Sequence, residues 1–165
     1  MGRYYTGDIE GKMGFGTQPS NTFEQFGGTE LEPTVLRYQF TGVMSDDNEY
    51  GFDKDRLLYL VNSYNSNIKN WKEKYKYCKP ESLSEKEQDL MKLLPIEDED
   101  IDKIIKEDNW EEGFELCIMD PYLNYLSMYK NPVSEEIRLL EDIFLGLKIY
   151  KQVLNNEECY VEVDI

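Results

Sequence analysis

The alternation of apolar and polar residues predicts two strands in this chain. Segment 35–41 alternates throughout, and its apolar face holds Leu36, Tyr38 and Phe40. A period of two residues is typical of a strand with one buried face. Segment 159–165 alternates in the same way. We therefore predict strands at both places, the second lying either beside the first or beside strands near the N-terminus.

Glycine is concentrated in the first part of the chain, where it alternates with aromatic and other apolar residues. Glycine is unfavourable inside helices and common in tight turns. The pattern predicts strands at Arg3–Thr6 and Lys12–Thr17, joined by a hairpin around Gly7–Gly11. The stretch Pro19–Pro33 is predicted to be loop, with one helical turn at Thr22–Phe26.

Apolar residues spaced three or four positions apart predict a long helix that begins after Asp53, a suitable N-cap, and ends before Pro80. Its apolar stripe consists of Leu57, Val61, Tyr64, Ile68, Trp71, Tyr75 and Cys78. Its C-terminal end carries Lys69, Lys72, Lys74, Lys76 and Lys79. We interpret these lysines as complementing the helix dipole and not as a nucleic-acid-binding patch.

Two shorter helices are predicted on either side of Pro95. Ser84 and Glu87 form a capping-box pattern at the start of the first helix. Its apolar residues are Leu90, Met91, Leu93 and Leu94. The second helix, at 97–107, begins with a run of carboxylates, which stabilise a helix N-terminus. Its inward face consists of Ile101, Ile104 and Ile105.

The last two helices are predicted from residue pairs that end in proline. Asp120-Pro121 places an N-cap before a proline at the first helical position and opens a helix over Pro121–Lys130. Asn131-Pro132 repeats this pattern, and the helix that follows extends to about Leu154. Its wide apolar sector, typical of a central buried helix, contains Ile137, Leu140, Ile143, Phe144, Leu147 and Tyr150.

The order of strands, several helices and a final strand predicts an α+β fold. We expect a small antiparallel sheet, made of the N-terminal strands, 35–41 and 159–165, packed against four to five helices. A chain of 165 residues is predicted to form a single domain, 1–165.

The net charge of −16 is unevenly distributed along the chain. Residues 81–120 contain 15 acidic residues and four lysines, a local net charge of −11. Such a surface repels a free phosphate backbone and attracts a basic surface. Clustered charge costs self-repulsion, which favours a binding role over the alternative that the acid only confers solubility. We therefore expect a basic nucleic-acid-binding protein as partner, with no direct binding of nucleic acid.

The helix predicted at 97–107 would present much of this acid. Its side chains four positions apart lie about 6 Å from one another, whereas phosphates on one DNA strand are about 3.4 Å apart along the axis and further apart along the backbone. The helix can therefore substitute for phosphates in a basic groove; a solvated helix face is the alternative. The predicted partner-binding residues are Glu97, Asp98, Asp100, Asp102, Glu107, Asp108, Glu111, Glu112 and Glu115, with Trp110 and Phe114 as aromatic anchors.

The chain contains no histidine, which removes Ser-His-Asp and Cys-His nucleophile systems and histidine-based zinc sites. Two acidic patterns are weak metal candidates. Asp8 and Glu10 would share a face in an extended strand, and Asp46–Gly51 begins like a calcium loop that lacks the final glutamate. We predict no catalytic residue, no metal site and no cofactor, and therefore a protein that is not an enzyme.

Three cysteines, Cys78, Cys117 and Cys159, are spaced about forty residues apart without a C-x-x-C pair. They are interpreted as buried free thiols of a reducing cytoplasm. The N-terminus lacks the apolar run of a signal peptide, and no stretch approaches the roughly 18 apolar residues of a spanning helix. We expect a cytoplasmic protein with no membrane association.

The opening Met1–Lys12, followed by Gly14-Phe-Gly16 and Phe26-Gly27-Gly28, resembles the N-terminus of small proteins from phages and gut metagenomes. With its small size and clustered acid, the whole chain resembles phage-encoded anti-defence proteins, in particular anti-CRISPR proteins. Many of these block nucleic-acid binding by a Cas effector, and some imitate DNA. The resemblance implies a Cas effector as partner in the host cytoplasm. It assigns no residue, because this group shares no common fold or motif.

Two other functions are compatible with the sequence. One is a small ligand-binding or metal-dependent enzyme domain that uses the glycine-rich N-terminus with Asp8 and Glu10. The other is a phage structural or assembly protein, in which the acidic residues serve only solubility.

Overall fold

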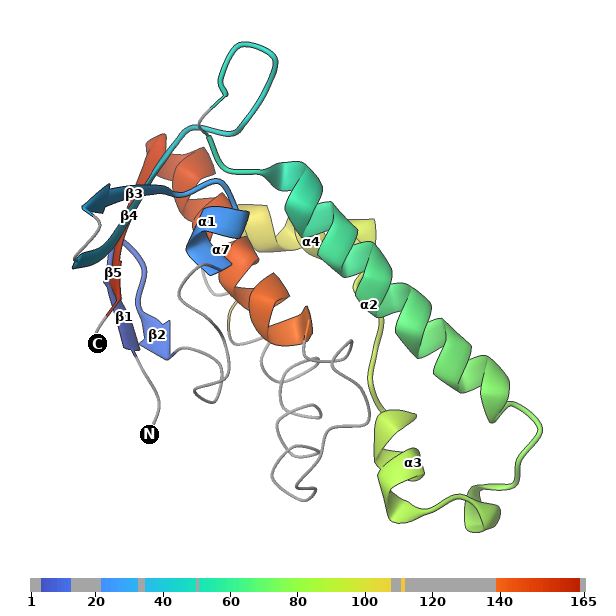
Figure 1. Cartoon of the computed structure of the whole chain (residues 1–165). Coiled ribbons are helices and arrows are strands. Elements are labelled where there is room, and N and C mark those ends of the chain that lie inside the picture. Colours follow the sequence, from blue (N-terminus) through green and yellow to red (C-terminus); the bar gives the residue numbers. More distant parts are fainter. Residues whose placement is uncertain are drawn as a thin grey trace. The chain divides into compact units, whose positions relative to one another are not determined.

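A computed structural model describes residues 4–12, 22–32, 35–49, 51–107, 111 and 139–163. The described residues form an α+β fold, as predicted (Figure 1). The chain divides into two compact units, one of Met1–Leu60 with Glu141–Ile165 and the other of Val61–Leu140. The expected single domain stays a prediction.

The first unit contains a five-stranded antiparallel sheet in the order β2-β1-β5-β4-β3 (Figure 1). The strands are β1 (Tyr4–Gly7), β2 (Gly11–Lys12), β3 (Thr29–Glu32), β4 (Val35–Thr41) and β5 (Glu158–Val163). The C-terminal strand β5 lies between β1 and β4, so both neighbours proposed for it are present. The N-terminal hairpin is also confirmed, because β1 pairs with β2.

The predicted loop at Pro19–Pro33 is wrong in part, because β3 occupies Thr29–Glu32 and pairs with β4. This strand lacks an alternating pattern, since Glu30 and Leu31 are both exposed. An edge strand needs only one hydrogen-bonded neighbour, so backbone pairing defines it without a buried face. The helical turn before it is confirmed as α1 (Thr22–Gln25). Of the strand predicted at Lys12–Thr17, only Lys12 lies within the described residues.

The core of the first unit lies between the sheet and α7 (Leu139–Asn156), which is buried along most of its length. Aromatic rings fill this space. Phe52 is fully buried and stacks on Phe26 and Tyr150, with ring centroids 5.7 and 5.3 Å away, and Phe40 lies 6.2 Å from it. The prediction of a central buried C-terminal helix is therefore confirmed for its described part.

The long helix is α2 (Lys54–Lys74), which begins in the first unit and continues into the second. The predicted cap is confirmed, because the Arg56 backbone N–H donates to the Asp53 carboxylate at 3.1 Å. The prediction that the helix continues to Pro80, with Cys78 in its apolar stripe, is wrong, because α2 ends at Lys74. The chain tightens beyond Lys74 into turns, in which the Cys78 N–H donates to the Tyr75 carbonyl three residues back, and Cys78 is exposed.

Three short elements follow α2 in the second unit: the 3-10 turn η2 (Pro80–Ser82), α3 (Glu85–Leu90) and α4 (Asp98–Lys106). Ser84 caps α3, because its hydroxyl accepts a bond from the Glu87 N–H at 3.2 Å. The helix ends at Leu90, so the predicted apolar face beyond that residue is not helical. Leu93 is instead buried in the segment, neither helix nor strand, that leads to α4.

Three parts of the predictions lie outside the described residues. They are the helix at Pro121–Lys130, residues 13–17 of the second predicted strand, and Ile137 in the last helix. No helix in the described part of the chain is both long and apolar enough to cross a membrane.

The two described cysteines differ in environment, which corrects the expectation that all three thiols are buried. Cys78 is exposed on a turn, whereas Cys159 is buried in β5. Burial raises the pKa of the Cys159 thiol from 9.0 to about 12, and the nearby Asp8 carboxylate adds to the shift. The third cysteine, Cys117, lies outside the described residues.

Thiol labelling tests this difference. In a Cys117→Ser background at about pH 8, we expect Cys78 to react rapidly and Cys159 about a thousandfold more slowly, because the raised pKa leaves far less thiolate. Both thiols should react rapidly in denaturant. Cys78→Ser should remove the fast phase, and equal native rates for the two thiols would contradict the burial of Cys159.

Candidate functional site: the acidic helix

The helix α4 is attached to α2 by hydrogen bonds that the sequence pattern does not reveal. The Asn65 side chain donates to the Ile96 carbonyl at 2.7 Å and accepts from the Ile96 N–H at 2.8 Å. The Tyr64 hydroxyl donates to the Leu94 carbonyl at 2.8 Å. Burial raises the pKa of Tyr64 above its usual value of 10.0, so this hydroxyl stays protonated and keeps its donor. Three hydrogen bonds from two side chains of α2 therefore hold the segment before α4.

One of the predicted carboxylates, that of Asp100, has a structural role at the start of α4. The Asp100 carboxylate accepts a hydrogen bond from the Glu97 backbone N–H at 2.9 Å, the return bond of a capping box. Negative charge in this first turn also stabilises the helix dipole. The opposite side of α4 is buried through Ile101 and Ile104. Cap and core together fix which face of the helix meets solvent.

The solvent-exposed side of α4 carries Asp98 and Asp102, as predicted, and also Glu99, which the predicted site left out. Asp98, Glu99 and Asp102 are exposed, and none has an ion-pair partner among the described residues. We call these three residues the α4 acidic face. Lys103 and Lys106 are exposed on the same helix and reduce its net charge without pairing with this face in the described part.

The other predicted site residues are only partly placed. Glu107 follows α4 directly, and its backbone N–H donates to the Lys103 carbonyl at 2.9 Å. Glu111 is exposed, but no described contact connects it to α4. The rest lie outside the described residues: Asp108, Trp110, Glu112, Phe114 and Glu115. The structure therefore brings together Glu97, Asp98, Asp100, Asp102 and Glu107, and the aromatic anchors stay a prediction.

The weak metal candidates have structural explanations. The Asp8 carboxylate accepts a hydrogen bond from the Tyr160 N–H at 2.8 Å and so joins the end of β1 to β5. In the acidic turn after β4, the Asn48 amide donates to the carbonyls of Thr41 and Val43 at 2.8 and 3.3 Å. No group of three or more metal-binding side chains occurs within the described ranges.

The buried cation Lys148 was missed by the sequence interpretation. Its ammonium donates to the Glu10 carbonyl at 2.7 Å and to the Tyr5 hydroxyl at 3.2 Å. It also lies 5.0 Å from the centroid of the Phe144 ring. A lysine inside the apolar sequence of the last helix is the signal that could have found it. These contacts join α7 to the N-terminal hairpin, a structural role.

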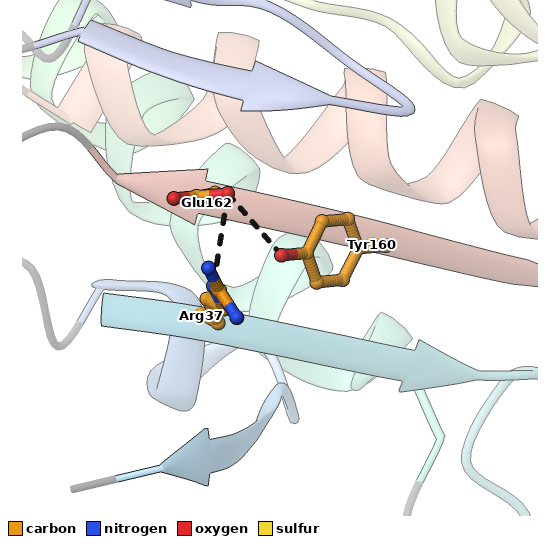
Figure 2. Close-up of polar contacts among 3 residues, drawn as sticks. All are labelled: Arg37, Tyr160 and Glu162. Atoms are coloured by element: carbon orange, nitrogen blue, oxygen red, sulfur yellow. Dashed lines mark hydrogen bonds and ion pairs between the residues drawn. The ribbon is translucent and has the colours of Figure 1, made fainter. Parts of the chain in front are cut away.

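A second missed cluster lies on the solvent side of the sheet. Figure 2 shows Arg37 on β4 facing Glu162 and Tyr160 on β5. The Glu162 carboxylate lies 3.7 Å from the Arg37 Nε and accepts from the Tyr160 hydroxyl at 3.3 Å. Arg37 and Glu162 are about half-exposed, so this pair contributes little stability. Its mixed charges make it a weaker candidate for a partner surface than α4.

Comparison with family models, with curated proteins and with solved structures found no match to this chain.

Proposed function

We propose that this protein is a non-enzymatic inhibitor that binds a basic, nucleic-acid-handling protein through the α4 acidic face and prevents it from binding nucleic acid. A Cas effector is the partner that fits the proposal best. The observation that carries it is the set of Asp98, Glu99 and Asp102 on α4, which are exposed and have no ion-pair partner among the described residues.

The spacing of the carboxylates supports this role. Asp98 and Asp102 are separated by four residues, or about 6 Å of helix rise. Repeated negative charge at this spacing suits lysines and arginines arranged to receive a phosphate backbone. Glu97, Asp100 and Glu107, which lie in or next to the ends of α4, add to the negative potential of this helix. Such a potential accelerates the encounter with a basic partner.

The attachment of α4 supports the proposal independently of charge. A surface that is held in place before binding loses less conformational entropy when it meets its partner. The bonds from Asn65 to Ile96 and from Tyr64 to Leu94 hold the segment immediately before the helix. The acidic face is therefore presented by a supported helix.

The enzymatic alternative receives less support from the residues it would use. The Asp8 carboxylate accepts a bond from the Tyr160 backbone, so it is committed to sheet pairing. Glu10 contributes its carbonyl oxygen to Lys148 in the described contacts. Neither carboxylate is part of a metal-binding group among the described residues.

The test is a competition experiment with purified, guide-loaded Cas effectors of several types and labelled target DNA. We expect the protein to displace DNA from at least one effector, and to do so less well as salt rises from about 50 to 200 mM. Asp98→Asn combined with Glu99→Gln and Asp102→Asn should weaken inhibition at least about tenfold, because it removes three charges from the contact.

The matched control is Asp46→Asn with Asp47→Asn and Glu49→Gln, which removes the same charge from exposed positions of the turn after β4. It should inhibit like the unchanged protein. Circular dichroism at the assay temperature should show that α4 survives, since loss of charge in its first turn costs about 0.3–1 kcal/mol per site. Undiminished inhibition by the α4 variant, or no displacement from any effector, would refute the proposal.

A further inference from the structure

The C-terminal end of α2 and the turn after it form a second charged surface with the opposite sign. Residues 69–79 contain five lysines and one glutamate, a local net charge of +4 in a chain of −16. Aromatic residues occur between the lysines. We call this set the lysine–aromatic surface, and it consists of Lys69, Lys72, Lys74, Lys76, Lys79, Trp71, Tyr75 and Tyr77.

The lysines of this surface are available for a ligand. Four of the five are exposed, Lys72 is half-buried, and none forms an ion pair within the described part of the chain. Trp71 and Tyr75 stack with ring centroids 5.7 Å apart, and the Lys74 ammonium lies 5.4 Å from each ring. The Lys76 ammonium lies 5.4 Å from the Tyr77 ring. The lysine ammonium groups and the aromatic rings of this surface therefore lie close enough to contact one ligand together.

Folding explains only part of this arrangement. Lys72 and Lys74 lie in the last turn of α2, where positive charge stabilises the helix dipole. Lys76 and Lys79 lie beyond the end of the helix. Tyr77 is 90% exposed, so its ring contributes little to the core. A large exposed ring between cations is typical of a contact surface.

The surface is separated from the acidic helix of the same unit. The segment before α4 is attached at Tyr64 and Asn65, and Lys74 lies about 15 Å further along the α2 axis. This distance exceeds the Debye length of about 8 Å at physiological salt. Charges at the attachment point are therefore largely screened from the end of α2.

We propose that the lysine–aromatic surface binds single-stranded nucleic acid. Its lysines would contact phosphates, while Tyr77 and the Trp71–Tyr75 pair would stack on unpaired bases. Unpaired bases would use the flat rings as well as the charges, whereas a duplex keeps its bases stacked inside. The expectation of no direct nucleic-acid binding followed from the overall charge, whereas this surface has a local charge of opposite sign.

The site extends the proposed function without depending on it. It uses the lysines and rings at the end of α2, which are different residues from those of the α4 acidic face. The test below contains no effector, so its failure would leave the competition experiment unaffected.

Fluorescence anisotropy of the full chain with a labelled oligothymidylate of about 12 nucleotides tests the site. With about three phosphate contacts, affinity should fall about 10- to 20-fold between 50 and 200 mM salt. Tyr77→Ala should weaken binding about fivefold or more through lost stacking. A duplex of equal length should bind more weakly.

The decisive variant is Lys74→Gln with Lys76→Gln, which should weaken binding about tenfold or more. Its control is Lys103→Gln with Lys106→Gln, an equal loss of exposed charge in the same unit, which should keep the unchanged affinity. Equal losses in the two variants, no binding at about 50 mM salt, or equal affinity for duplex would overturn the proposal. So would lysine-dependent self-association without oligonucleotide, which would assign this surface to the α4 of a second copy.

Discussion

Replacing Phe52 by alanine is expected to lower the free energy of unfolding by about 3–5 kcal/mol, enough to remove much of the stability of a small protein. Phe52 is fully buried, and its ring contacts Phe26, Phe40 and Tyr150. These partners come from three separate parts of the first unit, so the cavity left by the ring cannot be filled by a local movement. The backbone bonds of Phe52 with Gly42 and Met44 do not depend on the side chain.

Urea unfolding monitored by near-ultraviolet circular dichroism measures this effect through the buried aromatic rings. The matched control is Tyr59→Ala, because Tyr59 is 61% exposed and its ring lies beneath the Arg56 guanidinium, 5.5 Å away. The control should change stability by about 0.5–1 kcal/mol at most. Similar losses in the two variants would show that Phe52 is not central to the core.

The sheet shows which strands a sequence pattern can reveal. Segment 35–41 alternates because Tyr38 and Phe40 face the core while Arg37 and Gln39 do not, and β4 has the predicted bounds. The edge strand β3 pairs through its backbone alone, so its side chains leave no periodic pattern. Alternation reports burial, and a strand without a buried face is invisible to it.

The end of α2 shows a second limit. The apolar spacing continues through Tyr75 to Cys78, although the helix stops at Lys74. Pro80 disfavours helical backbone at the residue before it, and the chain between the helix and the proline tightens into turns. The position of a following proline therefore predicts the end of a helix better than apolar spacing in the last predicted turn does.

The sequence predicted which residues of α4 are acidic and which face inward. It did not predict the hydrogen bonds that hold the helix on α2. The first-turn acids and the inward isoleucines of α4 are local features, and both were recognisable in the sequence. The bonds that position the helix join residues 30 and 31 positions apart. Such bonds depend on tertiary packing, and Asn65 looks like an ordinary polar residue of a long helix in the sequence.

Replacing Asn65 by aspartate is the most direct test of that support. Above the usual carboxyl pKa, the introduced charge keeps an acceptor for the Ile96 N–H but has no donor for the Ile96 carbonyl. Two oxygens then face each other at a half-buried position, so we expect a loss of about 2–4 kcal/mol in the free energy of unfolding of the second unit. Asn62→Asp, at an exposed position of α2, adds the same charge and should change stability by about 0.5 kcal/mol or less.

The defect should depend on pH in a direction that identifies its cause. A protonated carboxyl can donate to the Ile96 carbonyl and accept from the Ile96 N–H, as the amide does. Folding therefore favours the protonated form and raises the carboxyl pKa above its unfolded value of about 3.9. The variant should approach the stability of the unchanged protein at low pH and lose stability as pH rises through that range. A pH-independent loss would contradict this hydrogen-bonding role.

Amide hydrogen exchange connects this defect to the proposed function. At neutral pH, Asn65→Asp should accelerate exchange in α4, because the segment before the helix loses its attachment to α2. Partner binding should weaken with it, although the variant carries one more negative charge than the unchanged protein. A contact governed by overall charge alone would instead strengthen or stay the same, as expected for Asn62→Asp. Opposite shifts in the two variants would show that α4 acts through the position of its carboxylates as well as their number.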